Sequence, residues 1–272
     1  MAISCANVSA KLDSELSSAI KDIAESLPPP KDSFEAADWA QAGELAIPFL
    51  SLGYLITREK NIHYSYLVMD ARKRKKDWRS IPPPKVTVTS LPEKSIAACV
   101  HALGVIGGDN ALSAIEDFVI DDRRSVGIEL GRAWDAFPRK RYLERILSRC
   151  TALSLNKLPT QIEIQALKAL VFLEIYDCSS LTNLNLLSSL KDLQILEIKS
   201  CYELNNIDGI RELNELRAIR FTYCPGISDL SVLAELSKLE ELDISSCAPK
   251  IKLGNFKVKD LSKIRINAKI FT

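Results

Sequence analysis

The sequence predicts an α/β protein in which an α-helical N-terminal region precedes a solenoid of parallel strands with a period of about 23 residues. Four cysteines stand 23 residues apart, and a Leu-x-Ile or Ile-x-Phe triplet ends three residues before each of them: Cys178, Cys201, Cys224 and Cys247. Before about residue 150 this period is absent, and apolar residues recur at helical spacing instead. We therefore expect stacked repeats that each contribute one short strand, preceded by helices.

Residues 1–92 are predicted to be a helical region with a Pro-rich and basic linker. A helix is expected over 13–27, because apolar residues recur every three or four positions there and Pro28-Pro29-Pro30 ends the pattern. A second, more apolar helical stretch covers 36–56 and is expected to be kinked or divided at Pro48.

Residues 93–149 are predicted to form a HEAT-like helical cap. Four short helices are expected between Glu93 and Leu147, separated by turns such as Gly107-Gly108. The pair Asp121-Asp122, followed by two arginines, is interpreted as a solvated turn between two of these helices. Helix pairs of this kind would cover the apolar end of the first repeat, which water would otherwise reach.

Residues 150–272 contain the repeats. Each copy begins with a leucine, has apolar residues three and five positions later and a cysteine eight positions later; the copies begin at Leu170, Leu193, Leu216 and Leu239. This template resembles that of the leucine-rich repeat superfamily, in which each repeat of 20–29 residues supplies one strand. Members of that superfamily usually recognise other proteins over an extended surface, which implies a binding role.

The cysteine column is interpreted as a ladder of buried thiols. Neighbouring strands lie about 4.8 Å apart, so four equivalent cysteines would extend over about 15 Å and could not surround one zinc ion. Adjacent cysteines come close enough for a disulfide, but their side chains would run side by side and bridging would strain the repeats. A small buried thiol is therefore the expected role.

On each strand, the residue between two buried apolar positions is expected to point outward. Across the repeats these residues form one column, Glu174, Glu197, Arg220, Asp243 and Arg265. Arg220 and Asp243 would lie about 5 Å apart and could neutralise each other, as could Asp243 and Arg265. A self-neutralised ladder is thus one interpretation; the other is a partner-binding surface anchored by aromatic residues beside the column. The candidate binding residues are Phe172, Tyr176, Lys199, Arg220, Thr222 and Tyr223.

A second candidate surface is a basic run that follows Tyr64 and Tyr66. It consists of Arg72, Lys73, Arg74, Lys75, Lys76 and Trp78. Aromatic residues among basic ones can stack on bases while the cations neutralise phosphates. A solvated helix end or loop is the simpler interpretation, because the net charge of the whole chain is only +1. Nucleic acid is therefore not the expected partner.

The sequence offers no catalytic or cofactor-binding constellation. No P-loop pattern G-x-x-x-x-G-K-[ST] is present, and the two histidines, His63 and His101, have neither metal-ligand nor triad spacing. Cys99 and His101 are two positions apart on a predicted helix and would point to different faces. We expect no enzymatic activity, no cofactor, no metal and no evident small-molecule site.

The sequence contains no recognisable targeting signal. The N-terminus lacks the basic and long apolar segments of a signal peptide, and no stretch approaches the roughly 20 apolar residues of a membrane span. An odd number of cysteines, seven, is not typical of a secreted disulfide framework. These features predict a cytoplasmic protein that does not bind membranes.

The order of helices and repeats resembles the C-terminal sensor half of bacterial NACHT NTPases, the prokaryotic relatives of NLR immune receptors. The resemblance covers about residues 93–266 and is carried by 98–112, 126–137 and 142–147, which lead directly into the repeats. It implies a sensor in anti-phage immunity that binds a protein ligand or contacts a partner NTPase. Because the P-loop is missing, the chain would be a sensing portion without its motor, as a fragment or as a free-standing protein.

The sequence thus predicts a non-catalytic protein-recognition module that binds a protein ligand through the strand face of the repeats. The alternative is a constitutive structural adaptor or inhibitor of a partner protein that uses the same face. Regulated competition by a ligand would separate the two.

Overall fold

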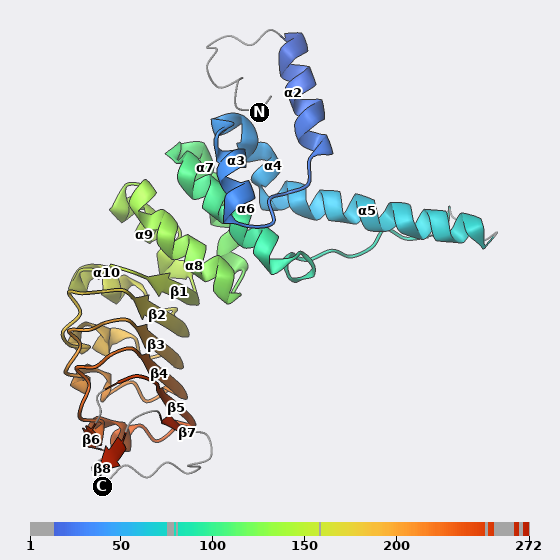
Figure 1. The fold of residues 1–272 in the computed structure, drawn as a ribbon. Coiled ribbons are helices and arrows are strands. Elements are labelled where there is room, and N and C mark those ends of the chain that lie inside the picture. Colours follow the sequence, from blue (N-terminus) through green and yellow to red (C-terminus); the bar gives the residue numbers. More distant parts are fainter. Residues whose placement is uncertain are drawn as a thin grey trace. The chain divides into compact units, whose positions relative to one another are not determined.

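A computed structural model describes residues 14–74, 79, 81–157, 159–247, 250–252, 264–266 and 269–271. The chain divides into two compact units, Met1–Pro138 and Arg139–Thr272. The first is helical in its described part, and the second contains the sheet (Figure 1).

The first unit is built around helix α6. Its helices are α2 (Ser14–Ser26), α3 (Ser33–Ala40), α4 (Ile47–Leu50), α5 (Leu52–Lys73), α6 (Glu93–Ile106), α7 (Gly108–Glu116) and α8 (Arg124–Arg132). Helix α6 packs against α3 and α8, and side chains such as Val100, Leu103 and Leu130 are buried there. Eight of the fourteen residues of α6 are buried, which explains why its apolar pattern runs almost all the way round the helix.

The predicted helices before residue 93 are partly confirmed. Helix α2 matches the expected helix over 13–27, although its proposed N-cap, Asp13, lies outside the described residues. The stretch over 36–56 is helical and divided, as expected, but α3, a 3-10 turn, α4 and the start of α5 share it, and α5 continues past Ile56 to Lys73. Pro48 occupies the first turn of α4, where its missing N–H costs no hydrogen bond.

The four helices predicted between Glu93 and Leu147 are confirmed as α6, α7, α8 and α9 (Arg139–Arg145). Helices α7, α8 and α9 are each continued by a short 3-10 helix, as in Asp117–Ile120 after α7. The last of the four, α9, belongs to the second unit.

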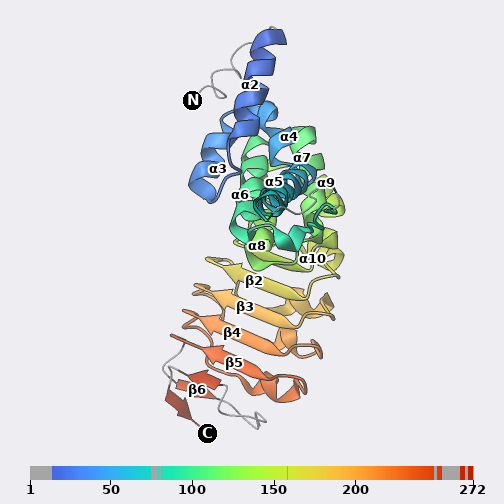
Figure 2. The same ribbon diagram turned by 90° about the vertical axis from the view of Figure 1, so that its right-hand side faces the viewer.

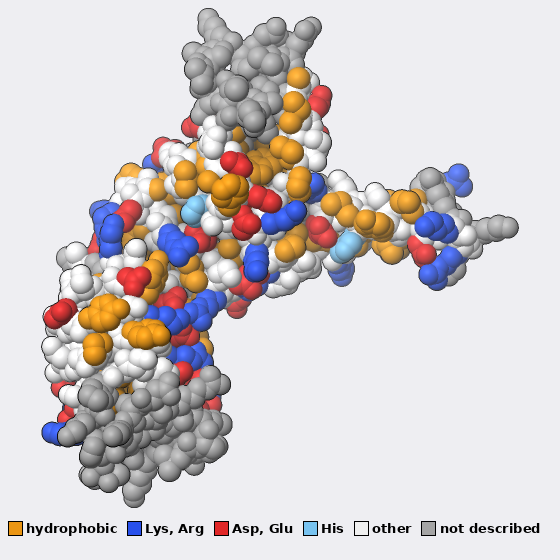
Figure 3. All heavy atoms as spheres, viewed as in Figure 1, with side chains coloured by type: hydrophobic (Ala, Val, Ile, Leu, Met, Phe, Trp, Pro, Cys, Tyr) orange, Lys and Arg blue, Asp and Glu red, His pale blue; other side chains and the backbone are white. Residues whose placement is uncertain are grey.

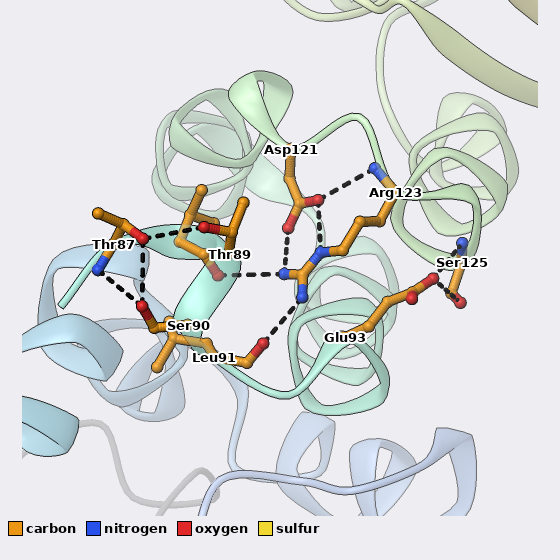
Figure 4. Close-up of polar contacts among 9 residues, drawn as sticks. Thr87, Thr89, Ser90, Leu91, Glu93, Asp121, Arg123 and Ser125 are labelled. Carbon is orange, nitrogen blue, oxygen red and sulfur yellow. Dashed lines mark hydrogen bonds and ion pairs between the residues drawn. The ribbon is translucent and has the colours of Figure 1, made fainter.

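The turn before α8 is only partly solvated: Asp122 and Arg124 are exposed, as interpreted, but Asp121 is buried. The Arg123 guanidinium donates from Nε and Nη2 to the two carboxylate oxygens of Asp121 at 2.8 and 2.6 Å, and the Asp121 side chain is inaccessible to water. Its Nη1 donates to the Leu91 carbonyl at 2.8 Å (Figure 4). One arginine therefore joins the α8 turn to the segment that leads into α6. A second link is Glu93, which accepts a hydrogen bond from the Ser125 backbone at 3.0 Å.

The second unit is a parallel sheet in chain order (Figures 1 and 2). Its strands are β1 (Ala152–Leu155), β2 (Phe172–Tyr176), β3 (Ile195–Lys199), β4 (Ala218–Thr222), β5 (Glu241–Ile244) and β7 (Ile264–Ile266), while β6 (Lys250–Lys252) pairs with β8 (Lys269–Phe271). Helix α10 (Gln161–Ala166) joins β1 to β2, and short 3-10 helices over 185–189, 208–210 and 231–235 lie in the later connections.

The register confirms the repeat template. Leu173, Leu196 and Ile219 are direct neighbours on adjacent strands, and all three are fully buried. The returning segments pack equally closely, because a Cβ added at Gly209 would lie 2.2 Å from the carbonyl carbon of Leu184 in the preceding repeat. Only glycine fits at that position, since real Cβ atoms do not approach backbone atoms so closely.

A left-handed residue follows each of the four strands β2 to β5. Asp177, Ser200, Tyr223 and Ser246 have φ between 50° and 57°, and each directly precedes a cysteine of the column. This backbone conformation is unfavourable for residues with a Cβ, so the same turn in four repeats indicates a shared structural need. The turn directs the following cysteine into the core.

The ladder of buried thiols is confirmed for Cys178, Cys201 and Cys224, while Cys247 is half-buried; all four are free. The Sγ of Cys224 lies 3.6 Å from the Ile198 carbonyl of the neighbouring strand, within reach of a weak S–H hydrogen bond. Burial raises the pKa of Cys201 to about 12 and that of Cys224 to about 11.

We predict that Cys201 and Cys224 resist alkylation in the native protein. A thiol reacts as its thiolate, so a pKa two to three units above the ordinary value should slow labelling at pH 8 by at least roughly 100-fold, and burial slows it further. Iodoacetamide labelling followed by peptide mass spectrometry measures this, with labelling in 6 M guanidinium as the control. Rapid native labelling at either site would contradict the burial.

Candidate functional site

The strand face of the second unit carries the residues that the sequence singled out. Glu174, Glu197, Arg220 and Asp243 lie in one register across β2 to β5, as predicted, and Arg265 of β7 continues the row. Ser154 of β1 begins it. A second row at the strand ends contains Tyr176, Lys199 and Thr222.

Glu174 and Glu197 are almost completely buried, with 5% and 2% of their surfaces exposed. The Lys199 Nζ bridges them, at 2.6 Å from a Glu174 oxygen and 2.8 Å from a Glu197 oxygen. The Ser154 hydroxyl donates to the other Glu174 oxygen at 2.7 Å. Both buried carboxylates therefore pair with a cation, and Glu174 also accepts a hydrogen bond from a hydroxyl.

Arg220 continues this network to β5. Its Nη1 donates to Glu197 at 2.6 Å, and its Nη2 lies 3.0 Å from both carboxylate oxygens of Glu241. Burial alone would lower the pKa of Arg220, but the hydrogen bonds to Glu197 and Glu241 outweigh it and raise the pKa. We call the connected set the charge ladder: Ser154, Glu174, Glu197, Lys199, Arg220 and Glu241.

The predicted pairing of Arg220 with Asp243 is wrong. Glu241 enters the strand two residues earlier, and its longer side chain reaches the guanidinium, whereas Asp243 accepts a hydrogen bond from the backbone of Ser245 at 3.1 Å. The side chain of Arg265 lies outside the described residues. The interpretation of the column as a self-neutralised ladder is thus supported, with different partners from those expected.

The predicted aromatic residues differ in exposure. Tyr223 is 56% exposed, whereas Phe172 and Tyr176 are half-buried. Tyr202 is 60% exposed and was missed by the sequence reasoning. The signal was available, because Tyr202 follows a ladder cysteine directly and therefore falls at the turn after β3.

Tyr202 and Tyr223 lie on the neighbouring turns after β3 and β4. The Ser200 backbone, two residues before Tyr202, donates to the carbonyl of Thr222, directly before Tyr223, at 2.9 Å. Together with three residues at the strand ends, they form what we call the turn surface: Tyr176, Lys199, Tyr202, Thr222 and Tyr223. Lys199 is shared with the charge ladder, so only its outer part is accessible.

The basic run is only partly described. Arg72 and Lys73 end α5, and Arg74 follows it. Arg74 pairs with Asp70 one helical turn earlier, Nε to carboxylate oxygen, at 3.0 Å. Lys75, Lys76 and Trp78 lie outside the described residues, so no arrangement of the run as a nucleic-acid patch can be stated.

The two histidines form ordinary polar contacts. His63 lies 3.6 Å from Glu59 on the same helix, and His101 Nδ1 lies 2.8 Å from a Glu129 oxygen on α8. Burial raises the pKa of Cys99 to about 12, which makes its thiol a poor nucleophile. Among the described residues no cluster of histidine, cysteine and acidic side chains could hold a metal ion. None of the described helices is long and apolar enough to span a bilayer.

We predict that Arg220→Ala lowers the free energy of unfolding by about 2–3 kcal/mol, because it leaves the buried Glu197 with Lys199 as its remaining cation. The matched control is Arg217→Ala, directly before β4. Arg217 pairs with the exposed Glu240 at 3.3 Å, so its loss should lower the free energy of unfolding by less than about 1 kcal/mol. Urea unfolding followed by circular dichroism gives both values. Equal losses would show that the charge ladder does not stabilise the sheet.

No protein-family model and no curated protein sequence matches this chain. Among solved structures, an internalin from Listeria monocytogenes aligns at 18% identity over 43% of this chain and 45% of its own, with a TM-score of 0.25. The leucine-rich repeat domain of the type III effector XopL aligns at 16% identity over 72% and 76%, with a TM-score of 0.33. The alignment thus spans less than half of the internalin, and we draw no functional conclusion from either likeness.

Proposed function

We propose that the chain is a non-catalytic recognition module whose turn surface binds a protein ligand. The observation that carries the proposal is Tyr223, an exposed tyrosine held in left-handed backbone. The equivalent positions in the other repeats are occupied by aspartate and serine, which are small and polar.

A tyrosine at this position costs stability without a packing gain. Left-handed backbone is unfavourable for a bulky L-residue by roughly 1 kcal/mol, and only glycine, asparagine and aspartate adopt it readily. Its ring remains 56% exposed, so burial recovers only part of that cost. Strained residues of this kind are concentrated at binding sites, which supports a role in recognition.

The neighbouring residues suit a protein partner. Tyr202 adds a second exposed ring on the next turn, and tyrosine is among the residues that dominate protein interfaces because it buries a large rigid area and still donates a hydrogen bond. Every carboxylate of the charge ladder beside it has a cation within the ladder as its partner, so the ladder offers rigid shape rather than unpaired charge. Of the predicted binding residues, Arg220 therefore stabilises the sheet, while Tyr223, Tyr176 and Thr222 remain the proposed contacts with the ligand.

A finer form of the proposal follows from the resemblance of residues 93–266 to NACHT sensor halves. In this form the ligand is a phage protein, and recognition occurs in an NLR-like immune system, with an NTPase as partner. The alternative is a constitutive adaptor or inhibitor that holds its partner through the same turn surface. Capture that depends on infection supports the sensor, and capture that does not supports the adaptor.

We predict that Tyr223→Asn stabilises the fold and weakens ligand binding. Asparagine tolerates left-handed backbone, so the free energy of unfolding should rise by roughly 0.5–1 kcal/mol. Affinity capture from lysate of the source cells, quantified by mass spectrometry, should show a protein that wild type retains and the Tyr202→Ser/Tyr223→Asn variant loses.

The matched control for this capture is Phe34→Ser, which removes a 79% exposed aromatic ring from the first unit. It should retain the ligand as wild type does. Equal capture by all three proteins would argue against the turn surface as the binding site, whatever the gain in stability.

A further inference from the structure

Helix α5 has apolar residues on two sides, and only one side is covered. Tyr64 and Val68 are half-buried and Ala71 is buried, so this side faces the protein. On another side, Ile62, Tyr66 and Met69 are 40%, 68% and 54% exposed. Their spacing of four and three residues places them in one stripe, about 10 Å long at 1.5 Å per residue. Figure 3 shows hydrophobic side chains along α5, with basic ones near its end.

This stripe is one wall of a groove of about 720 Å³ between α5 and the end of α2. The groove is open to solvent along its length, and its lining includes Glu25, Tyr54, Arg58, Ile62, Tyr66 and Met69. An exposed apolar stripe beside a groove is typical of a surface that receives a helix, because the apolar side chains of an entering helix recur with the same spacing.

One donor of the Arg58 guanidinium is unsatisfied in this groove. Its Nη1 is buried and has no hydrogen-bond partner. Arg58 also lines a smaller cavity of about 220 Å³ beside Pro28, Pro29 and Leu91, so its guanidinium lies where the two hollows adjoin. A buried donor without an acceptor costs free energy, and a carboxylate is the acceptor that would satisfy it best.

The charges around the groove are unequally paired. The carboxylates already have partners: Glu25 lies 3.9 Å from Lys21, Glu59 lies 3.6 Å from His63, and Asp70 lies 3.0 Å from Arg74. Within the part of the chain that the structure describes, Arg58, Lys60 and Lys73 have no ion pair. Among the charged residues that line the groove, Arg58 therefore retains a donor without an acceptor, and Lys73 adds a cation at the end of the stripe.

We propose that the α5 groove is a docking site for an amphipathic helix of a partner protein whose apolar stripe is flanked by carboxylates. The stripe of Ile62, Tyr66 and Met69 supplies the apolar contact, and Arg58, with Lys73 one turn beyond Met69, selects acidic over basic partners. The site lies in the first unit and is separate from the turn surface. A second copy of this chain is a poorer occupant, because its α5 would bring further unpaired cations.

Two synthetic 21-residue helical peptides test the proposal by fluorescence anisotropy with the full chain. Both carry the same leucine stripe at alternating three- and four-residue spacing; one has glutamate and the other lysine at the flanking positions. The acidic peptide should bind at least roughly tenfold more tightly than the basic one at low salt, and the difference should shrink at high salt. Equal binding of both peptides, or preference for the basic one, overturns the proposal.

The affinity of the acidic peptide for substituted chains shows whether it binds in this groove. Tyr66→Ser should weaken the acidic peptide roughly tenfold and Arg58→Gln roughly threefold to tenfold. Tyr202→Ser, which removes a comparably exposed tyrosine from the turn surface, and Lys140→Gln, which removes an 89% exposed cation from the second unit, are the matched controls and should change nothing. Loss of binding in the controls, or none in Tyr66→Ser, overturns the assignment.

Two further measurements test the other possible occupants of the groove, a second copy of this chain and a lipid surface. Sedimentation velocity should show the same monomeric state for wild type and Tyr66→Ser; a wild-type dimer that this substitution dissociates overturns the proposal in favour of self-association. Anionic vesicles of phosphatidylcholine and phosphatidylserine should not pellet the chain; pelleting that Tyr66→Ser abolishes, without peptide binding, overturns it in favour of a lipid surface.

Discussion

Parallel stacking of repeats that share one apolar template places the same sequence position of each copy side by side, about 4.8 Å apart. Two glutamates at one position, Glu174 and Glu197, would then repel each other at the surface of the sheet. The structure resolves this by inserting Lys199 between them and by turning Arg220 back onto Glu197. The rigidity of the strand face, and of the turns that present Tyr202 and Tyr223, depends on this neutralisation.

The apolar register of the repeats could be predicted because the period is written in the sequence and a strand has only two faces. Leu173, Leu196 and Ile219 are buried neighbours for that reason. The ion-pair partner of Arg220 could not be predicted from the sequence, because a guanidinium on a long side chain reaches several positions. Glu241 is only two residues from the expected Asp243. The buried Asp121–Arg123 pair was missed likewise, since paired opposite charges have the same sequence pattern in a solvated turn.

Helix α5 shows a different limit. Its apolar residues lie on two sides and alternate with charged ones, so the pattern has no single face, and the expected helix ended at Ile56 instead of Lys73. Only the structure distinguishes the covered side, which includes Ala71, from the open side with Tyr66. A recognition surface in each unit would suit a protein that joins two partners.

The charge ladder also makes the repeats non-interchangeable. Loss of one whole copy of 23 residues would keep every apolar position in phase and leave the core continuous. Loss of the copy that carries Arg220, however, would bring Glu197 beside Asp243 and remove the cation that now pairs with Glu197. Gain or loss of a copy in this array is therefore constrained by charge as well as by hydrophobic packing.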